Sequence, residues 1–252
     1  MTRAMEQWLR VDQTAFCPGC GHGILLGALL RAIDELGLDQ KQLLFVSGIG
    51  CAAWIPSPNI KADTLHTLHG RAVAYATGAK LANPRLTTIV VSGDGDLTSI
   101  GGNHLIHAAR RNLDLTILCA NNQIYGMTGG QTASTTPLGV KTATDPRGNP
   151  FRPFDLCALV KAAGAPYAAR WPVTRPKKLV ESIKRAIQTP GLGFVEALSP
   201  CPTQLGRRNR FDDVAALYDH LNRSCVSREQ VGQLSQKELL NHFVIGEFGE
   251  DE

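Results

Sequence analysis

Four short apolar segments constrain the fold of this chain more than any other feature. They are almost continuous in hydrophobic residues, as strands covered on both faces are, whereas a half-exposed strand alternates apolar and polar residues. These segments are residues 43–47, 88–92, 115–119 and 193–198. Apolar residues at helical spacing occur before and between these segments. They predict helices at residues 24–36, 70–83, 102–112 and 177–188. The alternation predicts an α/β fold, a doubly wound and mostly parallel sheet with crossover helices.

The 252 residues fit one α/β domain with an extension. We predict a main domain over residues 1–211 and a C-terminal part over 212–252, helical and amphipathic to about residue 242 and acidic from residue 247. Residues 126–153 show no periodicity and many Gly, Thr and Pro residues. A stretch of that length without regular structure is typical of a functional loop.

Charge and hydropathy exclude two classes of function. Lys and Arg total 26 against 22 Asp and Glu, and the only basic cluster is Arg207, Arg208 and Arg210. A nucleic-acid-binding protein usually carries a larger basic stripe. The arginine cluster fits a solvated loop, or a surface that receives a substrate carboxylate or an acidic protein. No segment has the uninterrupted apolar length of a membrane span, and the N-terminus has no secretory signal. We therefore expect a cytoplasmic protein without nucleic-acid or membrane partners.

Gly93-Asp94-Gly95 follows one predicted strand and precedes a helix. Glycines let a backbone approach an anion closely, and a helix N-terminus favours negative charge. Asp94 would repel a diphosphate unless a cation lay between them, so it suggests a magnesium-bridged diphosphate. Asn121-Asn122 ends the next predicted strand, one βαβ unit later, where a second ligand is expected. A plain turn would explain the glycines alone, but the combination favours a cofactor site.

Cysteines form a second constellation. Cys17 and Cys20 precede the first predicted helix, while Cys51 and Cys201 follow two predicted strands. Because ligands gather beyond the carboxyl ends of parallel strands, these cysteines are expected near the diphosphate site. Four cysteines suit zinc and an iron–sulfur cluster equally, so the residues alone leave both open. The other three cysteines are interpreted as small hydrophobic residues, and they are Cys119, Cys157 and Cys225.

The spacing of Gly93-Asp94-Gly95 and Asn121-Asn122 resembles the thiamine-diphosphate motif. Further motifs are similar to the β subunit of 2-oxoacid:ferredoxin oxidoreductases, over about residues 17–209; they are residues 16–23, 48–51, 68–72 and 125–131. This resemblance implies magnesium ligation by Asp94, Asn122 and the Ile124 carbonyl. It implies one [4Fe–4S] cluster on Cys17, Cys20, Cys51 and Cys201. The implied contacts to thiamine diphosphate are Ile49, Gly50, Cys51, Ala52, His69, Gly95, Asp96, Gly126 and Met127.

The resemblance also implies an activity. A 2-oxoacid would be oxidatively decarboxylated, with electrons passing through the cluster to ferredoxin and the acyl group to coenzyme A. One domain of this length carries only the diphosphate half of a thiamine site, so the activating Glu is expected on a separate α subunit. The loop motifs look most like the 2-oxoglutarate members. Alternatives are a branched-chain 2-oxoacid member, the subunit of a non-redox thiamine-dependent decarboxylase, and a zinc-stabilised interaction module.

Overall fold

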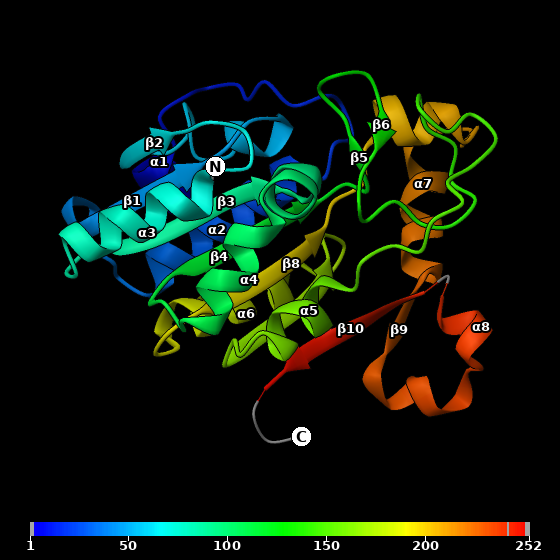
Figure 1. Ribbon diagram of the computed structural model, residues 1–252. Helices are drawn as coiled ribbons and strands as arrows, with labels where there is room; N and C mark the ends of the chain where they lie inside the picture. The colour runs from blue at the N-terminus through cyan, green and yellow to red at the C-terminus, as the bar shows by residue number, and fades with distance from the viewer. Residues whose placement is uncertain (1–2, 241, 250–252) are drawn as a thin grey trace.

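The computed structural model describes residues 3–240 and 242–249. Its main feature is an eight-stranded sheet in the order β2-β1-β3-β4-β8-β7-β10-β9 (Figure 1). All neighbouring strands are parallel except β10 and β7, which are antiparallel. The strand bounds are β1 Leu43–Ser47, β2 Asp63–His66, β3 Thr87–Gly93, β4 Thr116–Asn121, β7 Tyr167–Pro172, β8 Gly193–Leu198, β9 Cys225–Ser227 and β10 Phe243–Phe248.

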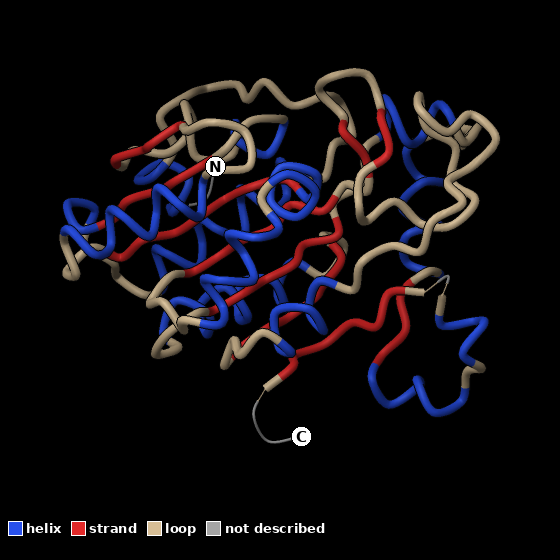
Figure 2. Tube along the Cα trace, in the orientation of Figure 1, coloured by secondary structure: helices blue, strands red, loops and turns tan. Residues whose placement is uncertain are grey.

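Helices cover both faces of this sheet. Their bounds are α1 Arg3–Trp8, α2 His22–Glu35, α3 Ala72–Ala82, α4 Gly102–Arg110, α5 Leu156–Ala162, α6 Pro176–Gln188, α7 Val214–Arg223 and α8 Gln236–Leu239. A separate hairpin is formed by β5 (Ile124–Tyr125) and β6 (Gln131–Thr132). Figure 2 shows the long loop that leads from β6 to α5. Among the described helices, none has the length and apolar character needed to cross a bilayer.

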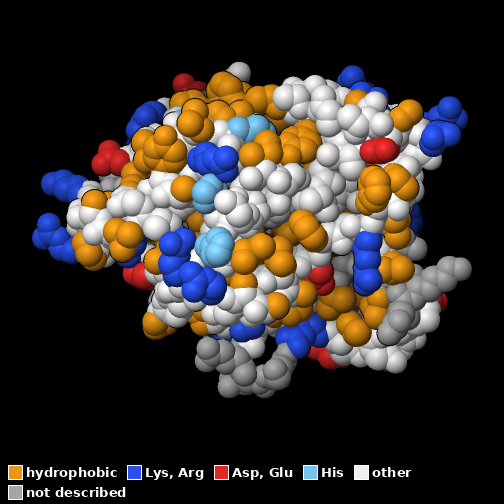
Figure 3. All heavy atoms as spheres, in the orientation of Figure 1, with side chains coloured by type: hydrophobic (Ala, Val, Ile, Leu, Met, Phe, Trp, Pro, Cys, Tyr) orange, Lys and Arg blue, Asp and Glu red, His pale blue; other side chains and the backbone are white. Residues whose placement is uncertain are grey.

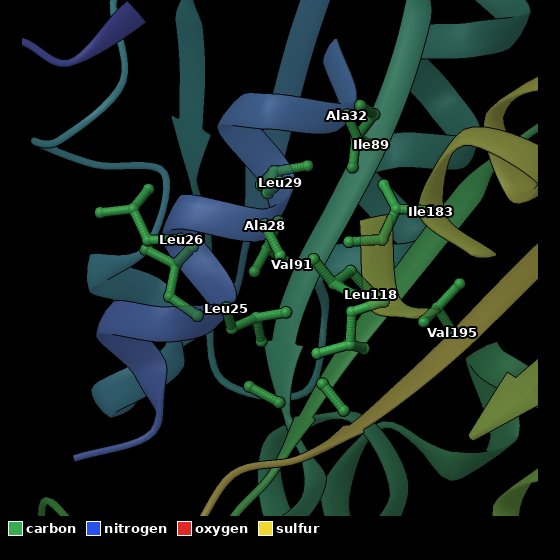
Figure 4. Packing of buried hydrophobic residues seen from close by; sticks show 14 of the residues in the cluster. Leu25, Leu26, Ala28, Leu29, Ala32, Ile89, Val91, Leu118, Ile183 and Val195 are labelled. Carbon is green, nitrogen blue, oxygen red and sulfur yellow. The ribbon is translucent and has the colours of Figure 1, made fainter. Parts of the chain in front are cut away.

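Two hydrophobic cores lie on opposite faces of the sheet. On one face, Leu25 and Leu29 of α2 and Ile183 of α6 pack against β3 and β4 (Figure 4). On the other face, α3, α4 and α5 pack against residues such as Val90 and Phe194. Successive strand residues point to opposite faces, and both faces are covered, so nearly every residue of the central strands is buried. This burial explains the uninterrupted apolar segments and confirms the doubly wound α/β fold.

The four predicted strands and four predicted helices are all present, with ends shifted by a few residues. The sequence pattern missed strands that carry polar residues. Strand β7 contains Arg170, and β2 is largely exposed, so neither has a continuous apolar sequence. Helix α5 is short, and its first turn is capped by Asp155, which accepts from the Ala158 N–H at 3.1 Å.

The C-terminal part corrects one expectation. Residues 212–242 were expected to be helical, but after α7 the chain forms β9, a 3₁₀ segment and the short α8. Residues 247 and 248 were expected to begin an acidic tail, but they end strand β10. Glu247 accepts hydrogen bonds from Tyr167 and Ser182, both at 3.0 Å. Strand β10 lies between β7 and β9, and β9 forms the edge of the sheet. The last residues of the expected tail, 250–252, lie outside the described residues.

A buried ion pair links the central strands to the C-terminal strand. The Arg170 guanidinium donates to Glu196 at 2.7 Å, to Asp155 at 2.5 Å and to the Val244 carbonyl at 2.9 Å. Glu196 in turn accepts from the Asn121 side chain at 2.7 Å. Thus the network reaches the residue next to the predicted ligand Asn122.

We expect Arg170→Met to destabilise the fold by about 3–5 kcal/mol, because it leaves the buried Glu196 carboxylate without its cation. The measurement is urea unfolding followed by circular dichroism. Lys184→Met is the matched control, since Lys184 pairs with Glu35 at the surface, where ion pairs contribute little. Equal losses in the two variants would contradict the structural role of the Arg170 network.

Candidate functional site

One cavity lies beyond the carboxyl ends of β1, β3 and β4. It is lined by every residue predicted to contact thiamine diphosphate or magnesium, and we call it the Asp94 cavity. These lining residues are Ile49, Gly50, Cys51, Ala52, His69, Asp94, Gly95, Asp96, Asn122, Ile124, Gly126 and Met127. Parallel strands place their carboxyl ends at one edge of the sheet, which is why segments far apart in the sequence meet here.

Asp94 lies directly after β3 and its side chain is 1% exposed. One carboxylate oxygen accepts from the Asn122 N–H at 3.2 Å, and the other accepts from the Thr135 hydroxyl. Burial raises the pKa of Asp94 to about 7, against which the Thr135 hydrogen bond acts. Sequence reasoning missed Thr135, which lies in the long loop where no periodicity marks individual residues.

The raised pKa of Asp94 makes the metal-free fold sensitive to pH. Between the ordinary pKa of 3.8 and about 7, the unfolded chain carries an Asp94 anion while the folded chain carries the protonated acid. Folding therefore takes up a proton, and the free energy of unfolding falls as pH rises. Relative to Asp94→Asn, the wild-type protein in chelator should lose on the order of 2–3 kcal/mol between pH 5 and pH 8. Denaturant titrations at each pH measure this difference, and parallel curves for both proteins would refute it.

The turn after β4 orients the second predicted ligand. The Asn122 side-chain oxygen accepts from the Ile124 N–H at 3.2 Å, and Gln123 between them has a φ of 65°. The Tyr125 hydroxyl, which sequence reasoning also missed, donates to the Gly95 carbonyl at 3.0 Å. The turn thereby holds its carbonyl and amide oxygens beside the Asp94 carboxylate.

The Asp96 side chain binds the loops that line the cavity. It is buried, and it accepts from the backbone N–H groups of Gly70 at 2.7 Å and Ile49 at 3.2 Å. The His69 ring and the Ser92 hydroxyl also donate to it. A Cβ at position 48 would lie 1.9 Å from an Asp96 oxygen, so glycine is needed there. Asp96 thus positions Ile49 and His69 against the cavity.

A second cavity, of about 420 Å³, is lined by all four cysteines predicted as cluster ligands. We call it the cysteine cavity, and its cysteines are Cys17, Cys20, Cys51 and Cys201. Burial raises the pKa of Cys20 to about 12 and that of Cys51 to about 11, with smaller contributions from the neighbouring cysteines. Within the described part of the chain, no group of three or more His, Cys, Asp or Glu side chains has the arrangement needed to hold one metal ion.

The remaining cysteines lie away from this cavity. Cys119 in β4 and Cys157 in α5 are fully buried in the same hydrophobic core, as predicted. Cys225 is partly buried in β9. Arg207 lines the cysteine cavity, whereas Arg208 donates to the Gly129 carbonyl at 2.7 Å.

The two cavities share a wall. Five residues line both of them: His22, Cys51, Asn122, Gly126 and Met127. A Cβ at position 126 would lie 3.3 Å from the Asn122 amide nitrogen, 3.5 Å from the Cys51 sulfur and 3.6 Å from the Cys201 sulfur. A side chain at this position would therefore contact residues that line both cavities.

His22 is the member of this wall whose importance the sequence did not reveal. It begins α2 and is 1% exposed, and burial lowers its pKa to about 4. Its Nδ1 lies 2.7 Å from the Ser199 hydroxyl, whereas its Nε2 is buried without a hydrogen-bond partner among the described residues. Buried polar atoms are rarely left unpaired, so Nε2 is available for a hydrogen bond to a group bound in the cavities.

Comparisons with known proteins agree with this geometry. Residues 48–197 match the family model described as "Thiamine pyrophosphate enzyme, C-terminal TPP binding domain", where thiamine pyrophosphate is another name for thiamine diphosphate. The chain is 46% identical to 2-oxoglutarate synthase subunit KorB of Methanothermobacter marburgensis, over 97% of this chain and 86% of that protein. It is also 46% identical to the 2-oxoacid:ferredoxin oxidoreductase subunit beta of Saccharolobus solfataricus, over 77% of this chain and 64% of that one.

A solved structure is similar over the whole chain. It is the 2-oxoglutarate:ferredoxin oxidoreductase from Magnetococcus marinus with 2-oxoglutarate, coenzyme A and succinyl-CoA bound. The TM-score is 0.86 with 34% sequence identity, covering 100% of this chain and 86% of that one. The matched domain, the relatives and the shared architecture lead to one conclusion: the chain belongs to the thiamine-diphosphate-dependent 2-oxoacid:ferredoxin oxidoreductase family, as its β subunit.

Proposed function

We propose that this chain is the β subunit of a 2-oxoglutarate:ferredoxin oxidoreductase, which converts 2-oxoglutarate and coenzyme A to succinyl-CoA and CO₂ while reducing ferredoxin. In this proposal the Asp94 cavity takes magnesium and the diphosphate of thiamine diphosphate, and the cysteine cavity takes one [4Fe–4S] cluster. The observation that carries the proposal is the wall that the two cavities share. A simple decarboxylation needs no electron acceptor, whereas an oxidative one needs it beside the cofactor.

The residues of the Asp94 cavity fit a magnesium-bound diphosphate. Magnesium prefers oxygen ligands, and this cavity offers the Asp94 carboxylate, the Asn122 side chain and the Ile124 carbonyl. The Asp94 carboxylate is buried and accepts from the Asn122 N–H and the Thr135 hydroxyl, which are both uncharged, so a cation would stabilise its ionised form. A bound cation would lower the raised pKa of Asp94.

The residues of the cysteine cavity fit a cluster bound by four thiolates. Burial disfavours the thiolates of Cys20 and Cys51, and iron would supply the positive charge that stabilises them. Cys17 and Cys20 come from the loop before α2, while Cys51 and Cys201 follow β1 and β8. Ligands from three separate segments can surround a cluster from several sides.

When bound, thiamine diphosphate supplies carbanion chemistry at the substrate carbonyl, and the cluster accepts electrons one at a time. The protein orients these groups. Asp94 and the 122–124 turn would hold the diphosphate end, and Asp96 keeps Ile49 and His69 in place beside it. Cys51 lines both cavities, which would bring the cluster close to the cofactor.

The carboxylates of this chain support a requirement for a partner. Among the described residues that line the Asp94 cavity, Asp94 and Asp96 are the only carboxylates. Asp94 is assigned to magnesium, and Asp96 accepts four hydrogen bonds from the protein. The Glu that activates the aminopyrimidine would therefore come from an α subunit, and the isolated chain would be inactive.

The preference for 2-oxoglutarate rests on the named relatives, and an assay tests it. Co-purified with its α partner under anaerobic conditions, the protein should contain about four irons and four sulfides per β chain. It should reduce ferredoxin only when 2-oxoglutarate, coenzyme A and thiamine diphosphate are all present. Faster turnover of branched-chain 2-oxoacids would reassign the substrate. CO₂ release without iron would favour a non-redox decarboxylase, and one zinc per chain without thiamine binding would favour an interaction module.

A further inference from the structure

We propose that His22 tunes the cluster by donating the hydrogen on Nε2 to one of its sulfur atoms, so that the hydrogen bond raises the reduction potential. This inference rests on the proposed function, because it requires a cluster in the cysteine cavity. It concerns a residue that is not itself a ligand. Its starting point is the one imidazole nitrogen that is buried, unpartnered among the described residues and located in the wall of that cavity.

The tautomer of His22 follows from its other nitrogen. The Ser199 hydroxyl lies 2.7 Å from Nδ1 and has no other acceptor among the described hydrogen bonds, so we assign Nδ1 as the acceptor of its hydrogen. A neutral imidazole with an accepting Nδ1 carries its hydrogen on Nε2. Nε2 is therefore a hydrogen-bond donor in need of an acceptor.

Both attachments of His22 lead to cysteine loops. Its backbone N–H makes a hydrogen bond to Cys20, and its ring partner Ser199 lies two residues before Cys201. The loops approach each other closely, since the Gly21 N–H donates to the Pro200 carbonyl at 3.3 Å and a Cβ at Gly21 would lie 2.6 Å from the Ser199 oxygen. The Phe16 ring packs edge-on against the His22 ring at 5.8 Å. These contacts fix the ring relative to the cluster loops, not to the diphosphate loops.

The chemistry of the acceptor gives the direction of the effect. Cluster sulfides and cysteine thiolates accept hydrogen bonds, and such bonds are among the determinants of the cluster potential. Reduction adds negative charge to the sulfurs, so a donor stabilises the reduced form more than the oxidised form. Removing the His22 donor should lower the potential and weaken the cluster as an electron acceptor.

The test uses the complete αβ protein with three variants. His22→Phe keeps a ring but removes the donor, His22→Gln keeps an N–H, and His107→Phe is a matched control because His107 is exposed on α4. Spectroelectrochemical titration should show a lower potential in His22→Phe, equivalent to about tenfold in the reduction equilibrium, or ~59 mV for one electron. His22→Gln should restore most of this change, and His107→Phe should match the wild type. With ¹⁵N-labelled histidine, the reduced cluster should show a weak nitrogen coupling that His22→Phe abolishes.

The remaining outcomes also decide the inference. An unchanged potential in a His22→Phe protein with full iron content excludes the hydrogen bond. A loss of thiamine diphosphate affinity at unchanged potential would assign the donor to the Asp94 cavity. If His22→Phe does not assemble a cluster, the reduction potential of Ser199→Ala is measured instead, because this variant keeps His22 but removes the hydroxyl that fixes its tautomer. A fall in this potential supports the inference, and an unchanged potential refutes it. A wild-type protein without iron would instead refute the proposed function, and the inference with it.

Discussion

Replacing Asp94 by asparagine is expected to abolish thiamine diphosphate binding in saturating magnesium. Asparagine keeps the shape of the side chain but removes the negative charge, which is the main attraction that this chain offers to the cation. Removal of a group that is merely hydrogen-bonded to a metal ligand costs about 10–100-fold in affinity, and loss of the ligand charge should exceed that range. Ferredoxin reduction should fall to background because no step of the proposed reaction proceeds without the cofactor.

Thr135→Val gives a graded comparison for this prediction. The Thr135 hydroxyl donates to the Asp94 carboxylate and does not itself line the cavity, so its removal should weaken binding within the range of about 10–100-fold. Asp114→Asn removes a carboxylate at an exposed site and should leave binding unchanged. Isothermal titration calorimetry with thiamine diphosphate measures all three variants. Binding of wild-type strength in Asp94→Asn would remove Asp94 from the magnesium site.

The Asp94→Asn substitution should have opposite effects on the stability of the metal-free fold and on the binding of thiamine diphosphate. The folded, metal-free chain favours protonated Asp94, so the ionised carboxylate destabilises it at neutral pH. A bound cation would stabilise the ionised carboxylate, so this loss of stability occurs at the site where cation binding would remove it. Such conflict between local stability and a buried charge is typical of functional sites.

The central sheet and the two ligand clusters could be predicted because their signals are local in the sequence. Nearly continuous apolar residues mark β1, β3, β4 and β8. Glycine, aspartate or asparagine directly follows each of the first three, and Cys201 lies three residues after β8. The rule that ligands gather at the carboxyl ends of parallel strands then placed both clusters at one edge. The structure confirms that edge as the location of both cavities.

The remaining features depend on contacts between distant segments, which one sequence does not reveal. Strand β7 has Arg170 at its centre, and a buried arginine is tolerated there only because Glu196 and Asp155 pair with it. Thr135 approaches Asp94 across 41 positions of sequence through a loop without periodicity. The unpartnered nitrogen of His22 became apparent only when the burial of its ring was known.

The surface around helices α3 and α4 bears on the partner requirement. Figure 3 shows hydrophobic side chains interspersed with basic and histidine side chains on this face. Leu68 just before α3, Tyr75 in α3 and Ile100 just before α4 are exposed. Leu68 and Ile100 belong to the segments that carry His69 and Asp96. An incomplete cofactor site and an exposed apolar surface next to it are both consistent with a subunit of a larger enzyme.

Replacing Cys20 by alanine is expected to separate the two cofactor sites. Cys20 lines the cysteine cavity but not the Asp94 cavity, so the variant should lose the [4Fe–4S] cluster and reduce ferredoxin only at the background rate. Its affinity for thiamine diphosphate should not change measurably. Iron analysis, the visible absorption spectrum and calorimetry measure these three properties.

Cys225→Ala is the matched control for Cys20→Ala, because Cys225 is also partly buried but lines neither cavity. It should retain the iron and the activity of the wild type. Ferredoxin reduction at the wild-type rate by Cys20→Ala would contradict electron transfer through the cysteine cavity. Equal loss of iron and of thiamine diphosphate binding would show that the two sites fold as one unit. Loss of iron alone would establish that the two sites assemble independently although they share a wall.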